Sequence, residues 1–180
     1  LNRLITDISD ASRVDAEMSR ADAEPVMLRD LLHAIADIYA ATAKEDAPRI
    51  EVIARTDDPL TVLGAEGRLG QVLRNLVSNA VSFSPPDGVI ALKARRHAGR
   101  IQIAVEDEGP GIPPDKLKAI FERFYSERPQ GEKFGTHSGL GLSISKQIVE
   151  AHGGTLTAEN LTSPDGRIRG ARFVVDLPAY

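Results

Sequence analysis

The sequence predicts an α+β fold, a two-layer sandwich in which helices cover one face of a mixed, mostly antiparallel sheet, preceded by part of a long helix. Apolar residues recur at helical spacing in several segments, and runs that alternate as strands do lie between them. Two such runs flank a short glycine-containing turn, which is typical of an antiparallel hairpin. The composition, 42% hydrophobic and 27% charged, is ordinary for a soluble globular protein.

Residues 1–20 are expected to end a long polar helix, because Leu4, Ile5 and Ile8 form only a narrow apolar stripe. This helix either packs, frayed, on its own domain or, as we favour, forms the second arm of a helical hairpin or dimerising bundle whose first arm is missing. The chain starts within this helical pattern and without an initiator Met. We therefore expect it to be a fragment of a longer protein.

Pro25 separates that arm from the elements that follow. Leucines and isoleucines at helical spacing predict a helix over 27–44, and two short alternating runs predict strands over 50–54 and 60–63. The next helix, 66–83, carries its apolar residues inward and ends before a Ser-Pro-Pro-Asp-Gly turn.

A hairpin follows, with strands over 89–95 and 100–107 around a turn at His97-Ala98-Gly99. The remaining expected elements are a short helix over 113–121, a mobile loop over 125–137, a helix over 141–152 closed by two glycines, and strands over 155–160 and 171–177.

Bulk composition argues against several classes of protein. A formal net charge of −4 does not indicate a broad nucleic-acid-binding face, and the absence of cysteine removes disulfide frameworks and thiolate metal sites. No apolar run approaches the roughly 18 residues that span a bilayer, and no signal peptide is recognisable. We therefore expect this fragment to contact neither nucleic acid nor membrane.

Two asparagines, Asn75 and Asn79, stand four residues apart in the predicted helix 66–83, so both lie on one helix face. Asparagine is a modest helix former, so two of them in an otherwise apolar helix need a reason. One reason is coordination of a metal such as Mg²⁺ through the carboxamide oxygens, completed by phosphates and water. Capping of neighbouring loop backbone is the structural alternative.

A second segment, residues 107–111, places one acid beside two glycines after a predicted strand. The carboxylate of Asp107 can accept a hydrogen bond from an exocyclic amine such as that of adenine, while Gly109 and Gly111 leave room for a base. A tight turn with a solvated acid is the alternative interpretation.

A third segment, Ser138-Gly139-Leu140-Gly141-Leu142, is a glycine-rich turn that opens a predicted helix. Free N–H groups at a helix start attract phosphate oxygens, although a simple loop-to-helix junction would have the same composition. Together the three segments suit a magnesium-bound nucleotide.

Residues 71–80, 107–113 and 138–142 resemble, in order and spacing, the N, G1 and G2 boxes of bacterial sensor histidine kinases, within the ATPase superfamily of Hsp90, gyrase B and MutL. Residues 120–125 resemble the F box between G1 and G2, and this run with the third segment is most similar to the ChvG/ExoS branch of alphaproteobacteria. The resemblance implies that 22–180 is a catalytic ATP-binding domain of the Bergerat fold (HATPase_c, or GHKL). It implies that 1–21 ends the second helix of a dimerisation and histidine-phosphotransfer domain.

The resemblance implies ATP and Mg²⁺ as ligands, with Asn75 and Asn79 binding metal and phosphate and Asp107 holding the adenine amine. The other implied nucleotide contacts are Phe83, Gly109, Gly111 and Ile112 around the base, Tyr125 at a lid hinge, and Ser138, Gly139, Leu140, Gly141 and Leu142 on the phosphate side.

Two positions depart from the pattern of many relatives. Ser82 stands where they carry Lys, and Ser126 stands where they carry Arg after the F-box Tyr. Both cations usually face phosphates in the family, so Arg128 is a candidate substitute for the second.

The implied activity is that of a protein-histidine kinase, which moves the γ-phosphoryl group of ATP to a histidine and then to an aspartate of a response regulator. The family's accepting histidine precedes an acid, whereas the four histidines here precede Ala, Ala, Ser and Gly. We therefore expect the acceptor to lie upstream, and this chain to bind ATP without autophosphorylating. The implied partners are the chain's own phosphotransfer hairpin and a cognate response regulator, in a homodimeric inner-membrane parent whose kinase domain is cytoplasmic.

Two other functions stay open. One is an ATPase or serine-directed kinase of the same superfamily, such as an anti-sigma factor, although the helical arm and the F box argue against it. The other is a pseudokinase-like module that binds nucleotide or only protein partners, which Ser82 and Ser126 leave possible.

Overall fold

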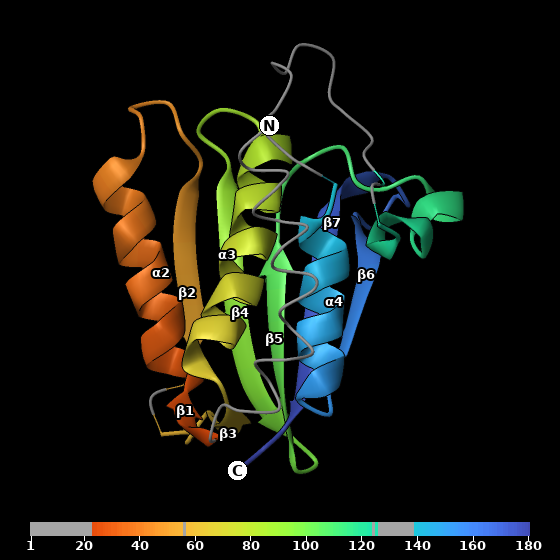
Figure 1. Ribbon diagram of the computed structural model, residues 1–180. Coiled ribbons are helices and arrows are strands. Elements are labelled where there is room, and N and C mark those ends of the chain that lie inside the picture. The colour runs from red at the N-terminus through yellow and green to blue at the C-terminus, as the bar shows by residue number, and fades with distance from the viewer. Residues whose placement is uncertain (1–22, 56, 124, 126–138) are drawn as a thin grey trace.

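A five-stranded sheet with helices on one of its faces forms the body of the molecule (Figure 1). The computed structural model describes residues 23–55, 57–123, 125 and 139–180. The strands are β1 (Glu24–Met27), β2 (Arg49–Ala54), β3 (Thr61–Gly64), β4 (Val89–His97), β5 (Arg100–Glu106), β6 (Thr155–Thr162) and β7 (Ile168–Pro178). The helices are α2 (Leu28–Thr42), α3 (Glu66–Phe83) and α4 (Gly141–Ala151), with short 3₁₀ helices η1 (Pro114–Lys116) and η2 (Ala119–Phe121).

The main sheet has the strand order β2-β4-β5-β7-β6. Strand β2 runs parallel to β4, and every other neighbouring pair is antiparallel. A parallel pair needs a crossover connection, which β3 and α3 provide between β2 and β4. The predicted mixed, mostly antiparallel sheet is therefore confirmed.

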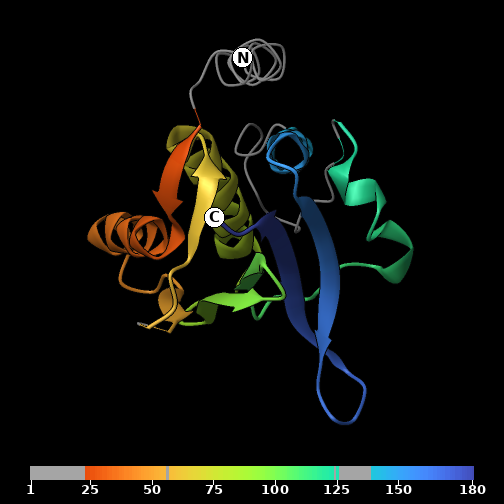
Figure 2. The same ribbon diagram turned by 90° about the horizontal axis from the view of Figure 1, so that it is seen from below.

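The core lies between the sheet and the helices, as the end-on view shows (Figure 2). Alternate residues of β5, namely Ile101, Ile103 and Val105, are fully buried toward the helical layer. Leu76 of α3 and Ile148 of α4 meet them with no exposed surface. Each such side chain contributes about 1.5–3 kcal/mol by leaving water. The helices of the α+β sandwich are thus fixed on one face of the sheet.

The opposite face of the sheet carries cross-strand ion pairs instead. Glu106 accepts from Lys93 Nζ at 2.8 Å and from Arg172 Nε at 2.7 Å, which links β4, β5 and β7. Charged pairs of this kind suit a face that meets water, as expected for an antiparallel sheet covered on one side only.

A second, two-stranded sheet corrects the predicted start of the fold. Residues 24–27 were expected to be a break between elements followed by the first turn of a helix. They instead form β1, which pairs antiparallel with β3, and α2 spans only Leu28–Thr42. Val26 and Val62 pair and are both buried, which draws the segment into a strand. Pro25 is tolerated because β1 is an edge strand.

The hairpin turn is shorter than predicted, because β4 continues through His97, which pairs with Arg100. Only Ala98 and Gly99 remain in the turn, and both have positive φ, +50° and +74°. Positive φ at both central residues is what a type I′ turn requires, and this turn matches the twist of the flanking strands.

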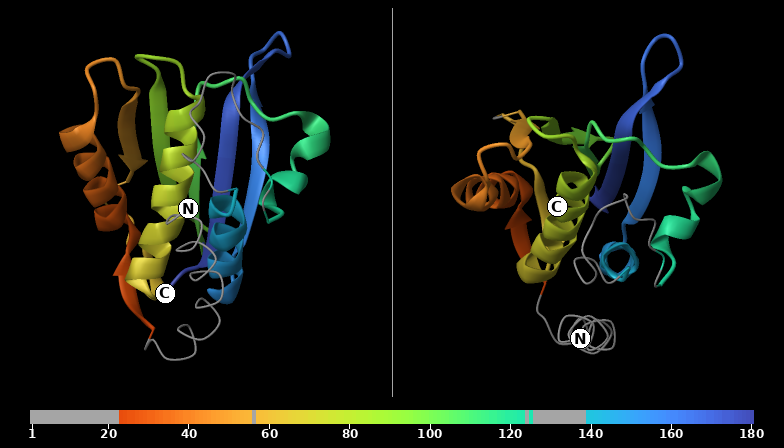
Figure 3. Two further views of the ribbon diagram at one scale, coloured as in Figure 1. Left: turned by 45° about the horizontal axis from the view of Figure 1, so that its top comes forward. Right: turned by 90° about the horizontal axis from the view of Figure 1, so that it is seen from above.

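The predicted helix over 113–121 is wrong in type, since the segment forms the separate 3₁₀ helices η1 and η2. Only Ile120 among their residues is buried, so no apolar face supports a longer helix. Both turns lie beyond β6, at the edge of the sheet opposite β2 (Figure 3).

Several sequence-based predictions fall outside the described residues. These are the N-terminal helix, the domain assignment of residues 1–21, and the loop over 125–137 apart from Tyr125. Within the ranges that the structure describes, no helix is both long and apolar enough to cross a membrane.

Candidate functional site

The first turn of α4 lies against α3 at the position of Asn75. The Asn75 Nδ2 donates to the Gly141 carbonyl oxygen and to Ser145 Oγ, each at 3.3 Å. Because a carbonyl oxygen can only accept, these bonds decide which end of the carboxamide is nitrogen. The oxygen Oδ1, the atom able to coordinate a cation, is therefore the end turned away from these two acceptors.

Asn79 lies one turn further along α3 and, like Asn75, is half-buried. The predicted placement of both carboxamides on one helix face is confirmed, because both residues lie within α3 and are four positions apart. Among the described residues, no three His, Cys, Asp or Glu side chains gather into a metal site. A divalent cation here would therefore depend on the two carboxamides, water and phosphate oxygens, a set that suits Mg²⁺.

Asp107 follows β5 directly and is only 3% exposed. Its Oδ1 accepts from the backbone N–H of Gly109 at 2.8 Å and of Ala171 at 3.2 Å. Burial raises the pKa of this carboxyl above its ordinary value, and the two N–H bonds oppose that shift. Within the described part of the chain both bonds go to Oδ1, which leaves Oδ2 as the acceptor for a ligand.

Gly109 allows the segment after β5 to approach the end of α3. A Cβ at this position would lie 2.6 Å from the Phe83 carbonyl oxygen and 2.9 Å from Asp107 Oδ1. The structure therefore gives a reason for glycine other than the predicted one, namely close approach to protein backbone. Whether Gly109 also borders a base stays a prediction.

Gly111 has φ +77°, and a Cβ there would lie 2.8 Å from Asn160 Oδ1. The Asn160 side chain clamps the next residue, because Oδ1 accepts from Ile112 N and Nδ2 donates to Ile112 O, both at 2.7 Å. Sequence reasoning missed Asn160, which comes from β6 and carries no local signal of this contact.

Gly170 was also missed. Its φ is +159°, and a Cβ there would lie 1.8 Å from the carbonyl oxygen of Asp107. An isolated glycine within a predicted strand is the signal that could have identified this close backbone approach.

The remaining predicted site residues divide into three groups. Leu140 is 1% exposed and belongs to the core, so any ligand contact there is made by its backbone. The second group is partly buried: Phe83 is the last residue of α3, and the side chains of Ile112, Tyr125 and Leu142 pack against the core. Gly139, which precedes α4, has a φ of +71°. Ser138, Ser126 and Arg128 lie outside the described residues.

The N-terminus of α4 begins at Gly141, as predicted, and carries no acidic residue in its first turn. Unpaired N–H groups and the positive end of the helix dipole make such a terminus suitable for phosphate oxygens. Near the C-terminal end of α3, Ser82 Oγ donates to the Ser78 carbonyl oxygen at 3.0 Å.

Comparison with known families decides the classification. The family model described as "Histidine kinase-, DNA gyrase B-, and HSP90-like ATPase" matches residues 64–180. The chain belongs to this family. The resemblance to histidine kinases, noted from the sequence, is thereby confirmed.

Among individual relatives, sensor proteins named ChvG are similar to this chain over almost its whole length. The sensor protein ChvG of Rhizobium meliloti (strain 1021) is 52% identical over 99% of this chain and 32% of its own length. The chain thus spans about a third of the length of the curated relatives it matches. The ChvG branch inferred from the sequence is also confirmed.

Solved structures of the family agree with the fold. Full-length ShkA in complex with AMPPNP superposes with a TM-score of 0.80 at 30% identity, covering 98% of this chain and 35% of that one. A mycobacterial sensor histidine kinase MprB gives a TM-score of 0.73 at 30% identity, covering 87% of this chain and 97% of that one. The chain therefore has the fold of the catalytic ATP-binding domains of histidine kinases.

Proposed function

We propose that this ATP-binding catalytic domain binds Mg-ATP between α3, the segment after β5 and the first turn of α4, and serves a sensor histidine kinase. The observation that carries the proposal is the buried Asp107 carboxylate. Its Oδ1 is held by two backbone N–H groups, while Oδ2 has no such bond among the described residues. A carboxylate oxygen set in this way suits the exocyclic amine of adenine.

The other residues take roles that fit their geometry. Asn75 and Asn79 offer carboxamide oxygens to the metal, and the start of α4 offers N–H groups to the phosphates. Mg²⁺, when bound, offsets phosphate charge and orients the γ-phosphoryl group. The clamp of Asn160 on Ile112 holds the loop beside the base. Support for a bound adenine nucleotide comes from ShkA, which was solved with AMPPNP.

The proposed wider activity is supported by the names of the relatives, which are sensor proteins and sensor histidine kinases. The γ-phosphoryl group would pass to a histidine on a separate helical hairpin and then to an aspartate of a response regulator. The parent would be a homodimer at the inner membrane with this domain in the cytoplasm. Catalysis would consist largely of aligning the phosphoryl group with the imidazole and stabilising its charge.

The test is calorimetry of ATP and ADP, with and without Mg²⁺, on the wild type and on Asp107→Asn. We expect micromolar binding by the wild type and a loss of at least tenfold in the variant. The asparagine keeps an oxygen for the Gly109 and Ala171 N–H groups, but it turns an NH₂ donor toward the adenine amine.

The matched control is Glu108→Gln. Glu108 is the neighbouring exposed acid, and its Oε2 accepts only from Val89 N in the described structure, at 2.9 Å. This variant should bind nucleotide as the wild type does. Absence of binding by the wild type would overturn the proposal and favour a module that binds protein partners only.

A further inference from the structure

Ser145 is a polar side chain with no exposed surface, in the middle of α4. Its neighbours Ile144, Ile148 and Val149 are core residues, so the hydroxyl sits in apolar surroundings. A buried hydroxyl without a partner costs free energy, and the partner here comes from another helix. Ser145 Oγ lies 3.3 Å from Nδ2 of Asn75 on α3.

The second buried serine of α4 behaves differently. Ser143 is 6% exposed, and its Oγ donates to the Leu140 carbonyl oxygen at 2.9 Å, within its own helical turn. Ser143 is therefore satisfied locally, whereas Ser145 reaches across the α3–α4 contact. The two serines are similarly buried, but their hydroxyl groups have different hydrogen-bond partners.

The contact with Ser145 bears on the orientation of a candidate metal ligand. A carboxamide can present either its oxygen or its nitrogen to a cation, and only the oxygen binds. Gly141 O and Ser145 Oγ both accept a hydrogen bond from Asn75 Nδ2, which turns Oδ1 away from α4. Removing the hydroxyl leaves one of the two bonds and lets the amide rotate more freely.

We propose that Ser145 is a positioning residue, whose hydroxyl holds the Asn75 carboxamide with its oxygen directed to the metal of a bound Mg-nucleotide. The inference rests on the proposed function, because it requires that Asn75 binds this metal. It assigns to Ser145 an effect on the metal-dependent part of nucleotide affinity. Recognition of the base depends instead on Asp107, which follows β5 and whose Oδ1 accepts from Gly109 N and Ala171 N.

The experiment measures the affinity of a non-hydrolysable ATP analogue by calorimetry, in Mg²⁺ and in EDTA, for the whole 180-residue chain. The ratio of the two affinities is the magnesium enhancement. Ser145→Ala should lower this enhancement about five- to tenfold, the equivalent of one net hydrogen bond. Its affinity in EDTA should stay within twofold of the wild type.

Two further variants make the result specific. Ser143→Ala removes a hydroxyl from a similarly buried site on the same helix and should leave the enhancement unchanged. In Asn75→Asp the two carboxylate oxygens are equivalent, so no orientation has to be held. Adding Ser145→Ala to that background should therefore have no further effect on the enhancement.

A measurement without ligand tests the proposal even if Ser145→Ala binds the nucleotide too weakly for calorimetry. In ¹⁵N spectra, the side-chain NH₂ protons of Asn75 should exchange with water faster in Ser145→Ala than in the wild type. Unchanged exchange, or an unchanged magnesium enhancement in a folded Ser145→Ala, overturns the positioning role alone. A wild type that shows no magnesium enhancement overturns the proposed metal site and this inference with it.

Discussion

At the scale of single residues, Asp107 shows a conflict between folding and ligand binding. Its carboxylate is buried, and burial raises its pKa despite two backbone N–H bonds to Oδ1. A raised pKa means that the ionised form is less stable in the folded chain than in the unfolded chain. The unliganded protein therefore bears a cost at neutral pH for keeping a charged acceptor ready for a ligand.

Replacing this acid by its amide should stabilise the unliganded protein. Asp107→Asn keeps the acceptor oxygen and removes the buried charge, so we expect a gain on the order of 1 kcal/mol at pH 7, or about 2–4 °C in Tm. The cost of the wild-type acid is present above its folded pKa and disappears as pH falls through that pKa toward the unfolded value of 3.8. The gain should therefore shrink on acidification.

Thermal melts of both proteins between pH 7 and pH 4 check this prediction. Equal Tm values at pH 7, or a difference that widens toward pH 4, would contradict the cost assigned to the buried carboxylate. Combined with nucleotide calorimetry, the result would separate the effect on folding from the effect on binding.

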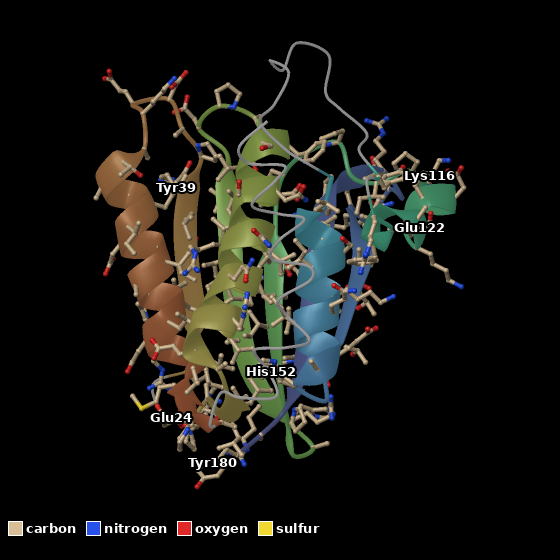
Figure 4. All side chains as sticks on the ribbon, viewed as in Figure 1. Glu24, Tyr39, Lys116, Glu122, His152 and Tyr180 are labelled. Carbon is tan, nitrogen blue, oxygen red and sulfur yellow. The ribbon has the colours of Figure 1, made fainter. Side chains whose placement is uncertain are left out.

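At the scale of elements, α3 is joined to both ends of α4. Asn75 contacts the first turns of α4, and His152, at the C-terminus of α4, reaches the start of α3 (Figure 4). His152 Nε2 accepts from Ala65 N at 3.1 Å while Nδ1 donates to Ile148 O at 2.7 Å, which is the pattern of a neutral imidazole. Ala65 is the N-cap residue of α3, and His152 accepts the hydrogen bond of its backbone N–H, which ties the end of α4 to the start of α3.

Removing the His152 side chain should loosen the pairing of the two helices. We expect His152→Ala to lower the free energy of unfolding by about 2 kcal/mol, because it deprives Ala65 N of an acceptor and leaves a space beside Gly64. Urea titrations followed by circular dichroism measure the effect. The control is His33→Ala, at an exposed position on α2, which should change stability by no more than about 0.5 kcal/mol. Equal urea midpoints for the two variants would show that His152 does not stabilise the contact between α4 and the start of α3.

Element boundaries show where sequence patterns were sufficient. The long apolar periodicity of α3 predicted Glu66–Phe83, and the structure has the same bounds. The segment 113–121 buries only Ile120 in its two turns, and there the predicted helix was wrong. Strand β1 was missed because its reason for being a strand is pairing with β3, which lies more than thirty positions away.

At the scale of the whole molecule, the three site segments meet at one end of the sheet. The C-terminal end of α3, the end of β5 and the start of α4 lie together there, while the β4–β5 turn and the C-terminus lie at the opposite end (Figure 1). Of the three histidines that the structure describes, His33 and His97 are exposed on other elements and both ring nitrogens of His152 are engaged, so none of these three is placed to act as the acceptor.

Phosphotransfer should therefore require a second polypeptide. With Mg²⁺ and ATP labelled at the γ-phosphate, we expect no label on this chain alone. We expect label on an added helical hairpin that carries a phosphoacceptor histidine. The same hairpin with its acceptor histidine changed to Ala is the control and should stay unlabelled. Acid-labile label on this chain itself would contradict the prediction, as would an unlabelled hairpin in the presence of bound ATP.

The sequence by itself determined the features that depend on neighbours along the chain. Helical spacing placed Asn75 and Asn79 on one face, and the composition of short segments identified Asp107, Gly109 and the glycine-rich start of α4, from which the family followed. Local periodicity and turn chemistry carry this information because they act over only a few residues.

Only the tertiary structure decided how those residues are held. Asn75 donates to Ser145 from 70 positions away, Asn160 clamps Ile112 from 48 positions away, and His152 accepts from Ala65 N from 87 positions away. No local pattern specifies such partners, because serine, asparagine and histidine occur at many positions where they contact only water. Their roles come from burial and from hydrogen bonds made when distant segments pack together.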